Sequence, residues 1–263
     1  MYCYSFKQII YTNGLFDNCV DATYIIHLLN NGRIDSIYRQ LERFRPTKVL
    51  YIVENQGYKM CTKELPEQTT GHDLVDAFLQ ICKHAKKNGY GNILILEDDF
   101  QFSDTILDKS TVNDICTFIN NKQNEKFLYY LGCLPWLKVP SISNHTRLLL
   151  SSGTHGVIYS TKTVDYLLKN TDLQHDWDIY LNMSVASLTR YMYHKPLCYQ
   201  VMEQTDNQNN WRLNTGANII IYIFRLFNVH ETIEPGTSQL YFISTITSLI
   251  FFTGIIMSII KLK

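Results

Sequence analysis

The sequence predicts an α/β domain, with a mixed sheet flanked by helices, followed by a C-terminal transmembrane helix. Two observations predict the domain: short apolar runs alternate with segments of helical periodicity, and the apolar run 93–96 ends directly in three acids. A third observation predicts the membrane helix, because residues 240–260 carry no charged side chain. The chain has 263 residues, 46% of them hydrophobic, which is enough for one sizeable core.

The first half of the chain alternates strands with helices. Apolar runs predict strands, and helical spacing of apolar residues predicts the helices between them: strands at 23–29, 48–55 and 93–96, and helices at 33–44 and 71–91. Gly89 and Gly91 are placed to end the second helix. This alternation predicts a mostly parallel sheet, whose ligands bind beyond the carboxyl ends of its strands.

The second half mixes helices with antiparallel strands. Its predicted elements, in order, are a helix at 111–121, a strand at 126–132, a hairpin of 146–150 and 154–160, helices at 161–168 and 176–189, a strand at 196–200 and a helix at 218–227. The expected organisation is therefore a lead segment at 1–20, the α/β domain at 21–228, a linker at 229–239 and a transmembrane anchor at 240–260.

Charge and cysteine content limit the partners and the kinds of site. Lys plus Arg is 24 and Asp plus Glu is 24, so no global field attracts nucleic acid, which is not an expected partner. The seven cysteines are an odd number and include no CxxC pair, which argues against a zinc cluster and against a complete disulfide framework. We therefore expect a reducing compartment.

Residues 240–260 are long enough to span a bilayer. These 21 residues cover about 31 Å at helical rise, and a hydrocarbon core is roughly 30 Å thick. A helix buried in a soluble core is the alternative, but such a helix shows a polar face, and this segment has only scattered Ser and Thr. Because only three residues follow it, we expect the segment to insert after synthesis as a tail anchor, with the domain on the cytosolic side.

Three acids, Glu97, Asp98 and Asp99, follow the strand at 93–96 with no turn residue between. An ionised carboxylate in a cleft is costly unless it has a partner, so three together favour a cation. Oxygen ligands suit Mg²⁺ or Mn²⁺, which one or two carboxylates commonly hold together with substrate phosphates. A helix N-cap or a solvated turn after a buried strand is the simpler interpretation of the same residues.

Three segments carry a family resemblance. They are TYIIHLLNNGRIDSIYRQL from residue 23, HDLVDAFLQICKHAKKNGYGNILILEDDFQFSD from residue 72, and GTHGVIYSTKTVDYLL from residue 153. In this order they resemble the motifs of glycosyltransferase family 25, and the resemblance covers roughly residues 22–200. It implies a GT-A-type, Rossmann-like fold. The family includes collagen and lipopolysaccharide galactosyltransferases and similar enzymes of large DNA viruses.

The resemblance implies a metal and donor site at the three acids. Asp99 is the expected principal ligand of Mn²⁺ (or Mg²⁺), Glu97 is expected to face the donor ribose, and Asp98 either binds the ion and donor or positions the loop. The implied donor is a UDP-sugar. The opening motif departs from the family, because Asn30, a further candidate donor contact, follows Leu where an Asp is usual, and Arg33 is close to the expected arginine but not clearly at its position.

Three histidines are weaker candidates for the same site. His72 stands at the family's histidine position, where it could face the nucleotide, although Thr70 or Asp73 as a helix cap explains the local polarity equally well. His155 is a candidate donor contact and His194 a candidate metal ligand. A lone histidine, however, is more often a surface residue or a satisfied core residue.

A catalytic base is expected near the start of the helix predicted at 176–189. The family resembles inverting enzymes, in which one carboxylate deprotonates the acceptor hydroxyl, and either Asp178 or Asp176 occupies the corresponding region. Trp177 between them is placed to stack on a sugar. An N-cap acid followed by a first-turn acid explains the pair without catalysis.

The function expected from these features is transfer of a hexose, galactose or glucose, from a UDP-sugar to a hydroxyl of a glycan or protein acceptor, with inversion. An inactive transferase domain kept as a sugar-binding or scaffolding module is the alternative, motivated by the altered opening motif. A nucleotidyltransferase is a third hypothesis, but LNNGRIDS is a poor match to a phosphate-binding loop. The expected location is a membrane of the host cell or of a virus.

Overall fold

The structure is a computed structural model that describes residues 3–170, 176–201, 222–223, 225–229 and 232–261. Nine strands form two sheets in this part of the chain: β1 Tyr4–Ile10, β2 Ala22–Leu28, β3 Val49–Asn55, β4 Ile93–Glu97, β5 Phe100–Phe102, β6 Phe127–Lys138, β7 His145–Tyr159, β8 Thr189–Tyr193 and β9 Cys198–Gln200. Seven of them form one sheet in the order β1-β3-β2-β4-β7-β6-β8, and β5 pairs with β9. The predicted class, an α/β fold with a mixed sheet flanked by helices, is confirmed.

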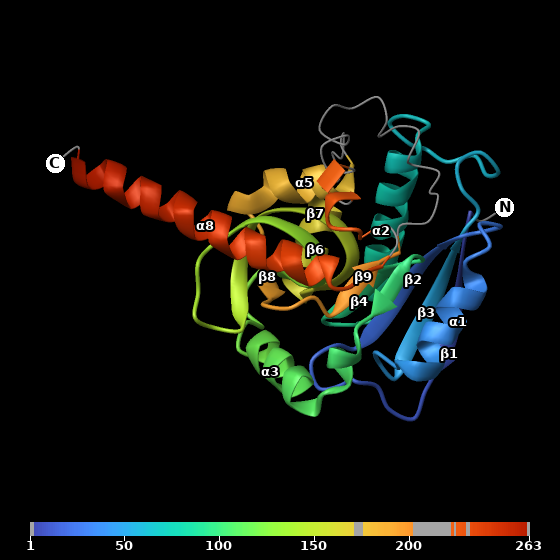
Figure 1. The fold of residues 1–263 in the computed structure, drawn as a ribbon. Helices are drawn as coiled ribbons and strands as arrows, with labels where there is room; N and C mark the ends of the chain where they lie inside the picture. The colour runs from blue at the N-terminus through green and yellow to red at the C-terminus, as the bar shows by residue number, and fades with distance from the viewer. Residues whose placement is uncertain (1–2, 171–175, 202–221, 224, 230–231, 262–263) are drawn as a thin grey trace.

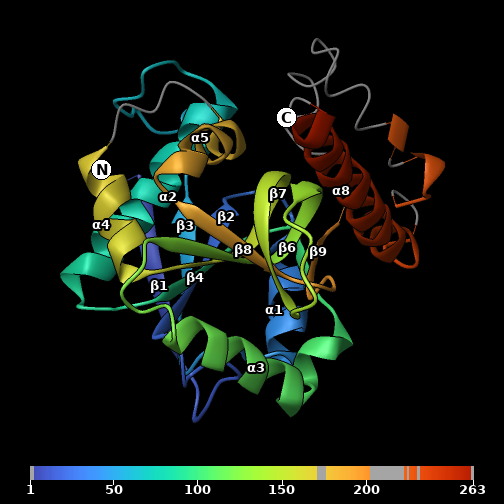
Figure 2. The ribbon, with the colours of Figure 1, turned by 90° about the vertical axis from the view of Figure 1, so that its left-hand side faces the viewer.

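Helices cover both faces of the large sheet (Figures 1 and 2). The described helices are α1 Ile34–Arg43, α2 Thr70–Lys87, α3 Lys109–Asn120, α4 Thr161–Lys169, α5 Trp177–Met183 and α8 Gly236–Lys261, with 3₁₀ turns at Asp104–Leu107 and Ser184–Ala186. Apolar residues of α2, α4 and α5 share one core cluster with the sheet, and those of α1 and α3 share the other. The apolar side chains of β2 alternate between these clusters, which is why its sequence reads as a nearly continuous apolar run.

The parallel centre of the sheet sets the position of the candidate site. β2 pairs in parallel with both β3 and β4, so the carboxyl ends of these three strands lie at one edge. β7 then adds antiparallel to β4, with Leu96 opposite Gly156. The acids that follow β4 therefore emerge between the end of β2 and the middle of β7.

Three predicted elements were wrong. Residues 4–10, expected to lie in a lead segment, form β1, which pairs antiparallel with β3 as a half-exposed edge strand. The predicted hairpin at 146–160 is one long strand, β7, whose hairpin partner is β6. The helix predicted at 176–189 ends at Met183, and residue 189 begins β8, which pairs with β6 and β7. These pairings depend on partners far along the chain, which local periodicity does not reveal. Half of the helix predicted at 218–227, residues 218–221 and 224, lies outside the described residues.

Helix α8 begins at Gly236, inside the stretch expected to be a linker, and ends at Lys261. It has a mean hydropathy of 2.1 and is long and apolar enough to cross a membrane. Its first half lies on β6, and its second half projects away from the domain (Figure 1). The predicted apolar C-terminal helix is thus present, with half of its length packed on the domain.

Four of the seven cysteines are paired. Disulfides join Cys3 to Cys61 and Cys19 to Cys116, with Cα–Cα distances of 5.6 and 5.1 Å, and the other three cysteines are buried and unpaired. The two disulfides were not predicted, because the spacing of cysteines along the chain does not reveal which of them meet in space. The cysteine content therefore no longer favours a reducing compartment.

We expect Cys19→Ser to lower the free energy of unfolding of the oxidised protein. The disulfide closes a loop with a sequence separation of 97 residues, and a loop of that length is worth about 3 to 5 kcal/mol through the restricted unfolded chain. Urea unfolding of the full chain in detergent, with and without reductant, measures the effect. In reductant the variant and the parent should unfold alike, and an equal stability in oxidising buffer would contradict the pairing.

Candidate functional site

Glu97, Asp98 and Asp99 leave the end of β4 at the carboxyl edge of the parallel strands. Glu97 lies opposite Ile26 of β2, and the residue before it lies opposite Gly156 of β7. None of the three acids is exposed, and Asp99 is 8% accessible. They therefore point into the protein between β2 and β7. A carboxylate in this position either has a partner that stabilises its charge or has a raised pKa.

Asp98 is held by the loop that follows β2. Its carboxylate accepts hydrogen bonds from Arg33 Nη1 at 2.7 Å, Asn31 Nδ2 at 2.5 Å and the Leu28 backbone N–H at 3.2 Å. Burial alone would raise its pKa, but the neighbouring His27 and the charge and hydrogen bond of Arg33 lower the pKa below its usual value. Asp98 is thus ionised, and the hydrogen bonds that it accepts hold the loop between β2 and α1 in place.

Asp99 keeps one carboxylate oxygen without a described partner. Its Oδ2 accepts from Gln200 Nε2 at 3.0 Å and lies 3.4 Å from Arg33 Nη1, and its backbone oxygen accepts from Val201 N–H at 2.8 Å. Its Oδ1 is buried and has no hydrogen-bond partner in the described part of the chain. Burial, and then the charge of Asp98, raise the pKa of Asp99 to about 6. Such an oxygen is suited to a cation or to a donor group of a ligand.

Glu97 and Asp178 share the hydroxyl of Thr154. Thr154 Oγ1 lies 2.7 Å from Glu97 Oε1 and 3.4 Å from Asp178 Oδ1, and its single proton can serve only one of them at a time. Gly153 N–H donates to Asp178 Oδ2 at 2.6 Å, from a backbone with φ of +81° that favours glycine. Burial, and then the charges of Asp99 and Asp178, raise the pKa of Glu97 to about 8. Burial also raises the pKa of Asp178.

The two candidate bases have different surroundings. Asp178, in the first turn of α5, belongs to the acid cluster through Thr154. Asp176, one residue before α5, lies against the first turn of α2, where a Cβ on Gly71 would overlap its Oδ1. Glycine at position 71 is therefore required for Asp176 to approach the positive N-terminus of α2. Trp177, which could have stacked on a sugar, is buried against Phe78 with ring centroids 4.7 Å apart.

The histidines differ in their relation to the acids. His155 follows Thr154 on β7, its Nδ1 is buried without a described partner, and burial lowers its pKa to about 4, so it is neutral. His72 lies in the first turn of α2, where Nδ1 is 2.9 Å from Oγ1 of Thr69, the residue that caps the helix. His194 lies at the end of β8, bonded through its backbone to Asn144, and no described contact joins it to the acids.

Asn30 and its neighbours form an exposed turn after β2. Asn30 has a φ of +66° and its side chain is solvent-exposed, so the departure from the family motif falls on the outside of the loop. The next residue, Asn31, contacts Asp98 instead. Sequence reasoning missed Asn31 and Gln200 as site residues. A polar residue one position from a motif is a signal for Asn31, but nothing in the sequence connects Gln200 with Asp99, which lies 101 residues away.

The acids fit a divalent cation only in part. Among the described residues, no group of three His, Cys, Asp or Glu could hold a metal ion by itself. Mg²⁺ and Mn²⁺, however, are usually held by one or two carboxylates plus substrate phosphates and water. The Asp99 Oδ1, which has no described partner, and the nearby Glu97, whose pKa the charge of Asp99 raises, are consistent with such a half-site.

We expect the parent to lose stability as the pH rises toward about 8, and Glu97→Gln to remove much of this loss. Glu97 has a folded-state pKa of about 8 against an ordinary 4.5, so the native chain holds a proton that the unfolded chain releases. Its contribution is full below the ordinary pKa and is lost as the pH rises through 8. Urea unfolding in chelator between about pH 5 and about pH 9 measures this slope. Glu64→Gln, at an exposed position, is the control, and an unchanged slope in Glu97→Gln would contradict the assignment.

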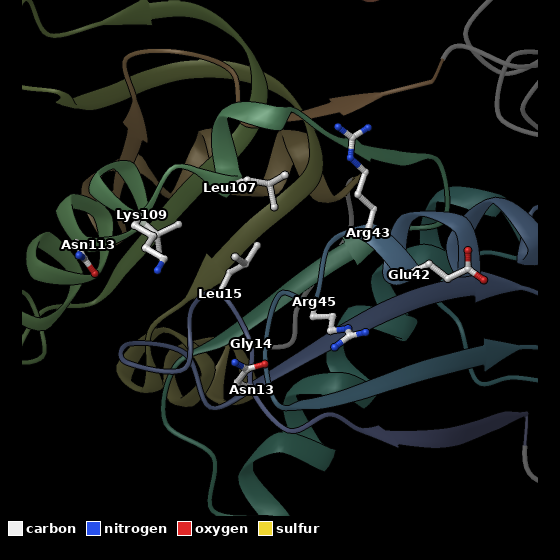
Figure 3. A pocket seen from close by; sticks show the side chains of 10 residues that line it. Asn13, Gly14, Leu15, Glu42, Arg43, Arg45, Leu107, Lys109 and Asn113 are labelled. Atoms are coloured by element: carbon white, nitrogen blue, oxygen red, sulfur yellow. The ribbon is translucent and has the colours of Figure 1, made fainter.

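A separate cavity lies at the opposite edge of the sheet (Figure 3). It has a volume of about 550 Å³ and is lined by the loop at 13–15, by Glu42 and Arg43 at the end of α1, by Arg45 in the loop after it, and by Leu107 and the start of α3. The loop at 13–15 precedes β2 and residues 42–45 precede β3, so the cavity lies at the amino ends of the parallel strands, away from the acids. This cavity is therefore not where the carboxylates converge.

Comparison with known proteins gives only distant similarities. No protein-family model and no curated protein matches this chain. Among solved structures, the chain is similar to a glycosyltransferase involved in the glycosylation of the major capsid of PBCV-1, with 10% identity, a TM-score of 0.40, and coverage of 74% of this chain and 98% of that one. A197 from STIV aligns with 11% identity and a TM-score of 0.40 over 69% and 85% of the two chains. A putative glucose-1-phosphate thymidylyltransferase from Bacillus anthracis, in complex with a sucrose, aligns with 12% identity and a TM-score of 0.35 over 74% and 75%.

Proposed function

We propose that this protein is a membrane-bound, divalent-cation-dependent glycosyltransferase of the GT-A type. In this proposal it moves a hexose, galactose or glucose, from a UDP-sugar to an acceptor hydroxyl with inversion. The observation that carries the proposal is the buried Oδ1 of Asp99, which has no partner among the described residues, close to Glu97 and Asp178 at the carboxyl edge of the parallel strands. The three motifs that resemble glycosyltransferase family 25 meet at this edge and support it.

The donor side of the site is assigned to the end of β4. Asp99 and Glu97 would hold Mn²⁺ or Mg²⁺ together with the donor diphosphate. When bound, the ion supplies positive charge that stabilises the departing diphosphate. Asp98 acts through Arg33, which it holds 3.4 Å from Asp99, so the guanidinium is a second positive group at the same place. His155 and His72 are further donor contacts in this proposal, and His194 and Asn30 have no role in it.

The acceptor side is assigned to Asp178. Its Oδ2 is fixed by Gly153 N–H, while its Oδ1 makes, within the described part of the chain, the longer contact with Thr154. That oxygen is the one we assign to take the proton of the acceptor hydroxyl. The raised pKa of Asp178 makes it a better proton acceptor than an ordinary aspartate once it is ionised.

Release of UDP by the full chain in detergent tests the function. We expect release from UDP-galactose or UDP-glucose with Mn²⁺, and none in chelator. Calorimetry with UDP and Mn²⁺ on the same sample separates the alternatives. Binding without turnover would favour the inactive sugar-binding module, and no binding would overturn the donor site.

A further inference from the structure

The anchor helix is joined to the domain by specific contacts along its first half. Tyr241 and Ser248 of α8 face β6, with Tyr241 Oη accepting from Cys133 N–H at 3.4 Å and Ser248 Oγ accepting from Lys138 N–H at 3.1 Å. Lys138 Nζ donates to the Tyr241 carbonyl at 3.4 Å. Leu240 joins a small apolar cluster with Leu134 of β6. The first half of the helix is thus part of the domain.

The free part of α8 is too short to span a bilayer by itself. Ser248 is the last residue of the helix that the domain buries, and Leu249–Lys261 is a stretch of 13 residues. At helical rise this covers about 20 Å, against roughly 30 Å of hydrocarbon. A spanning helix therefore needs part of the docked half in the membrane as well, and this brings β6, the strand on which it lies, against the bilayer.

The docked half of α8 exposes large apolar side chains where it would meet the lipid, and the loop between β6 and β7 exposes Ile142 among the polar Ser141, Ser143 and Asn144. On the docked half of α8, Phe242 is 66% exposed, and Ile243 and Ile246 are exposed with it. Ile142, in the loop between β6 and β7, is fully exposed. Large apolar side chains exposed next to a membrane helix are typical of an interfacial surface.

The start of α8 is also connected to the candidate site. Tyr199 of β9 donates a hydrogen bond to Glu234 Oε1 at 2.7 Å, and Ser238 N–H in the first turn of α8 donates to Glu234 Oε2 at 3.3 Å. The next residue of β9, Gln200, donates to Asp99 at 3.0 Å. One short strand therefore separates the anchor from the acids, so a domain lying on the membrane holds these acids near the surface.

We propose that α8 holds the domain flat on the bilayer and that the acceptor is the hydroxyl of a membrane lipid. The choice of acceptor rests on the proposed function, whereas the position on the membrane does not. In the transfer, the lipid hydroxyl oxygen forms a bond to the anomeric carbon of the donor hexose. The bond from that carbon to the diphosphate oxygen breaks, UDP leaves with the electron pair, and the hydroxyl proton passes to Asp178.

Quenching of Trp136 fluorescence tests the position on the membrane. Trp136 lies on β6 in the cluster that packs on α8, whereas Trp177 is in the core. In a Trp211→Phe background, the full chain is reconstituted into phosphatidylcholine vesicles with brominated acyl chains. We expect emission to be quenched, and Trp136→Phe to lose most of the quenched component. Emission from Trp136 that is unchanged by bromination would show that the domain stands off the bilayer.

A matched pair of glycine substitutions tests whether docking serves transfer to lipid. A Cβ on Gly236 would overlap the Phe227 carbonyl, whereas a Cβ on Gly254 meets nothing within 4 Å. Full-length protein is placed in phosphatidylcholine vesicles containing diacylglycerol or ceramide, with labelled UDP-hexose and Mn²⁺. We expect Gly236→Ala to lower the label in extracted lipid by about tenfold or more, because the cleft is misplaced. UDP release to water should be unchanged, and Gly254→Ala should match the parent.

The outcomes separate the acceptor from the function. Label in the lipid extract, absent with phosphatidylcholine alone, supports a lipid acceptor. Label only on protein or on a soluble glycan overturns the lipid acceptor but leaves the transferase intact. No UDP release under any condition overturns the proposed function, and the quenching of Trp136 still decides the position of the domain. Equal lipid labelling by the two glycine variants would show that docking does not guide transfer.

Discussion

Asp99→Asn is expected to lower the rate of UDP release by about 100-fold or more, because loss of one metal-binding group costs on the order of 10 to 100 in affinity and also removes charge from the reacting centre. Asparagine keeps an oxygen that can accept the hydrogen bond from Gln200, so the local fold should persist. Steady-state UDP release at several Mn²⁺ concentrations measures the effect. The variant should also lose the rise in melting temperature that Mn²⁺ and UDP give the parent.

The control for this prediction is an acid outside the cleft. Asp165 is a solvent-accessible acid paired with Lys86 at 2.5 Å, and exposed pairs of this kind contribute little to stability. Asp165→Asn should therefore keep both activity and the thermal response to Mn²⁺. An Asp99→Asn protein that still responds to Mn²⁺ as the parent does would contradict the placement of the ion.

Asp178→Asn is expected to lower turnover by about 100-fold to 10,000-fold, which is the usual contribution of a general base. Asparagine can still accept the Gly153 N–H, and the substitution removes a negative charge that raises the pKa of Glu97. The free energy of unfolding should accordingly stay the same or rise while catalysis is lost. A purely structural acid would show the opposite result, a loss of stability.

Donor binding distinguishes the role of Asp178 from that of Asp99. Calorimetry with UDP and Mn²⁺ should give the same affinity for Asp178→Asn as for the parent, because Asp178 lies on the acceptor side of the proposal. Asp176→Asn should keep most activity, since Asp176 packs on α2 and has no hydrogen bond to Thr154 among the described contacts. A larger loss of activity in Asp176→Asn than in Asp178→Asn would assign the base to Asp176 instead of Asp178.

Much of the parallel centre could be predicted from the sequence. The runs that became β2, β3 and β4 are apolar because both faces of a parallel sheet are covered, and the helices between them show their buried faces as a regular period. The acids after β4 could be predicted as a cluster at a strand end for the same reason. Local chemistry was enough for these elements because each signal lies within one element.

The edges of the sheet could not be predicted. β1 and β8 are short strands that gain their hydrogen bonds from β3, β6 and β7, and their sequences alternate too weakly to require pairing. The two disulfides join cysteines separated by 58 and 97 residues, so no spacing rule connects them. In each case the deciding interaction is with a distant part of the chain.

The sequence by itself determined that three acids would end a buried strand and that an apolar helix would follow the domain, because covalent order and periodicity are local properties. Only the tertiary structure decided what each acid does. Asp98 is saturated by Arg33, Asp99 keeps an oxygen without a described partner, and Glu97 competes with Asp178 for one hydroxyl. The docking of half the apolar C-terminal helix on β6 was decided in the same way. The charge and contacts of a carboxylate depend on its distances to groups that folding brings from distant parts of the chain. The residues next to it in the sequence do not determine these distances.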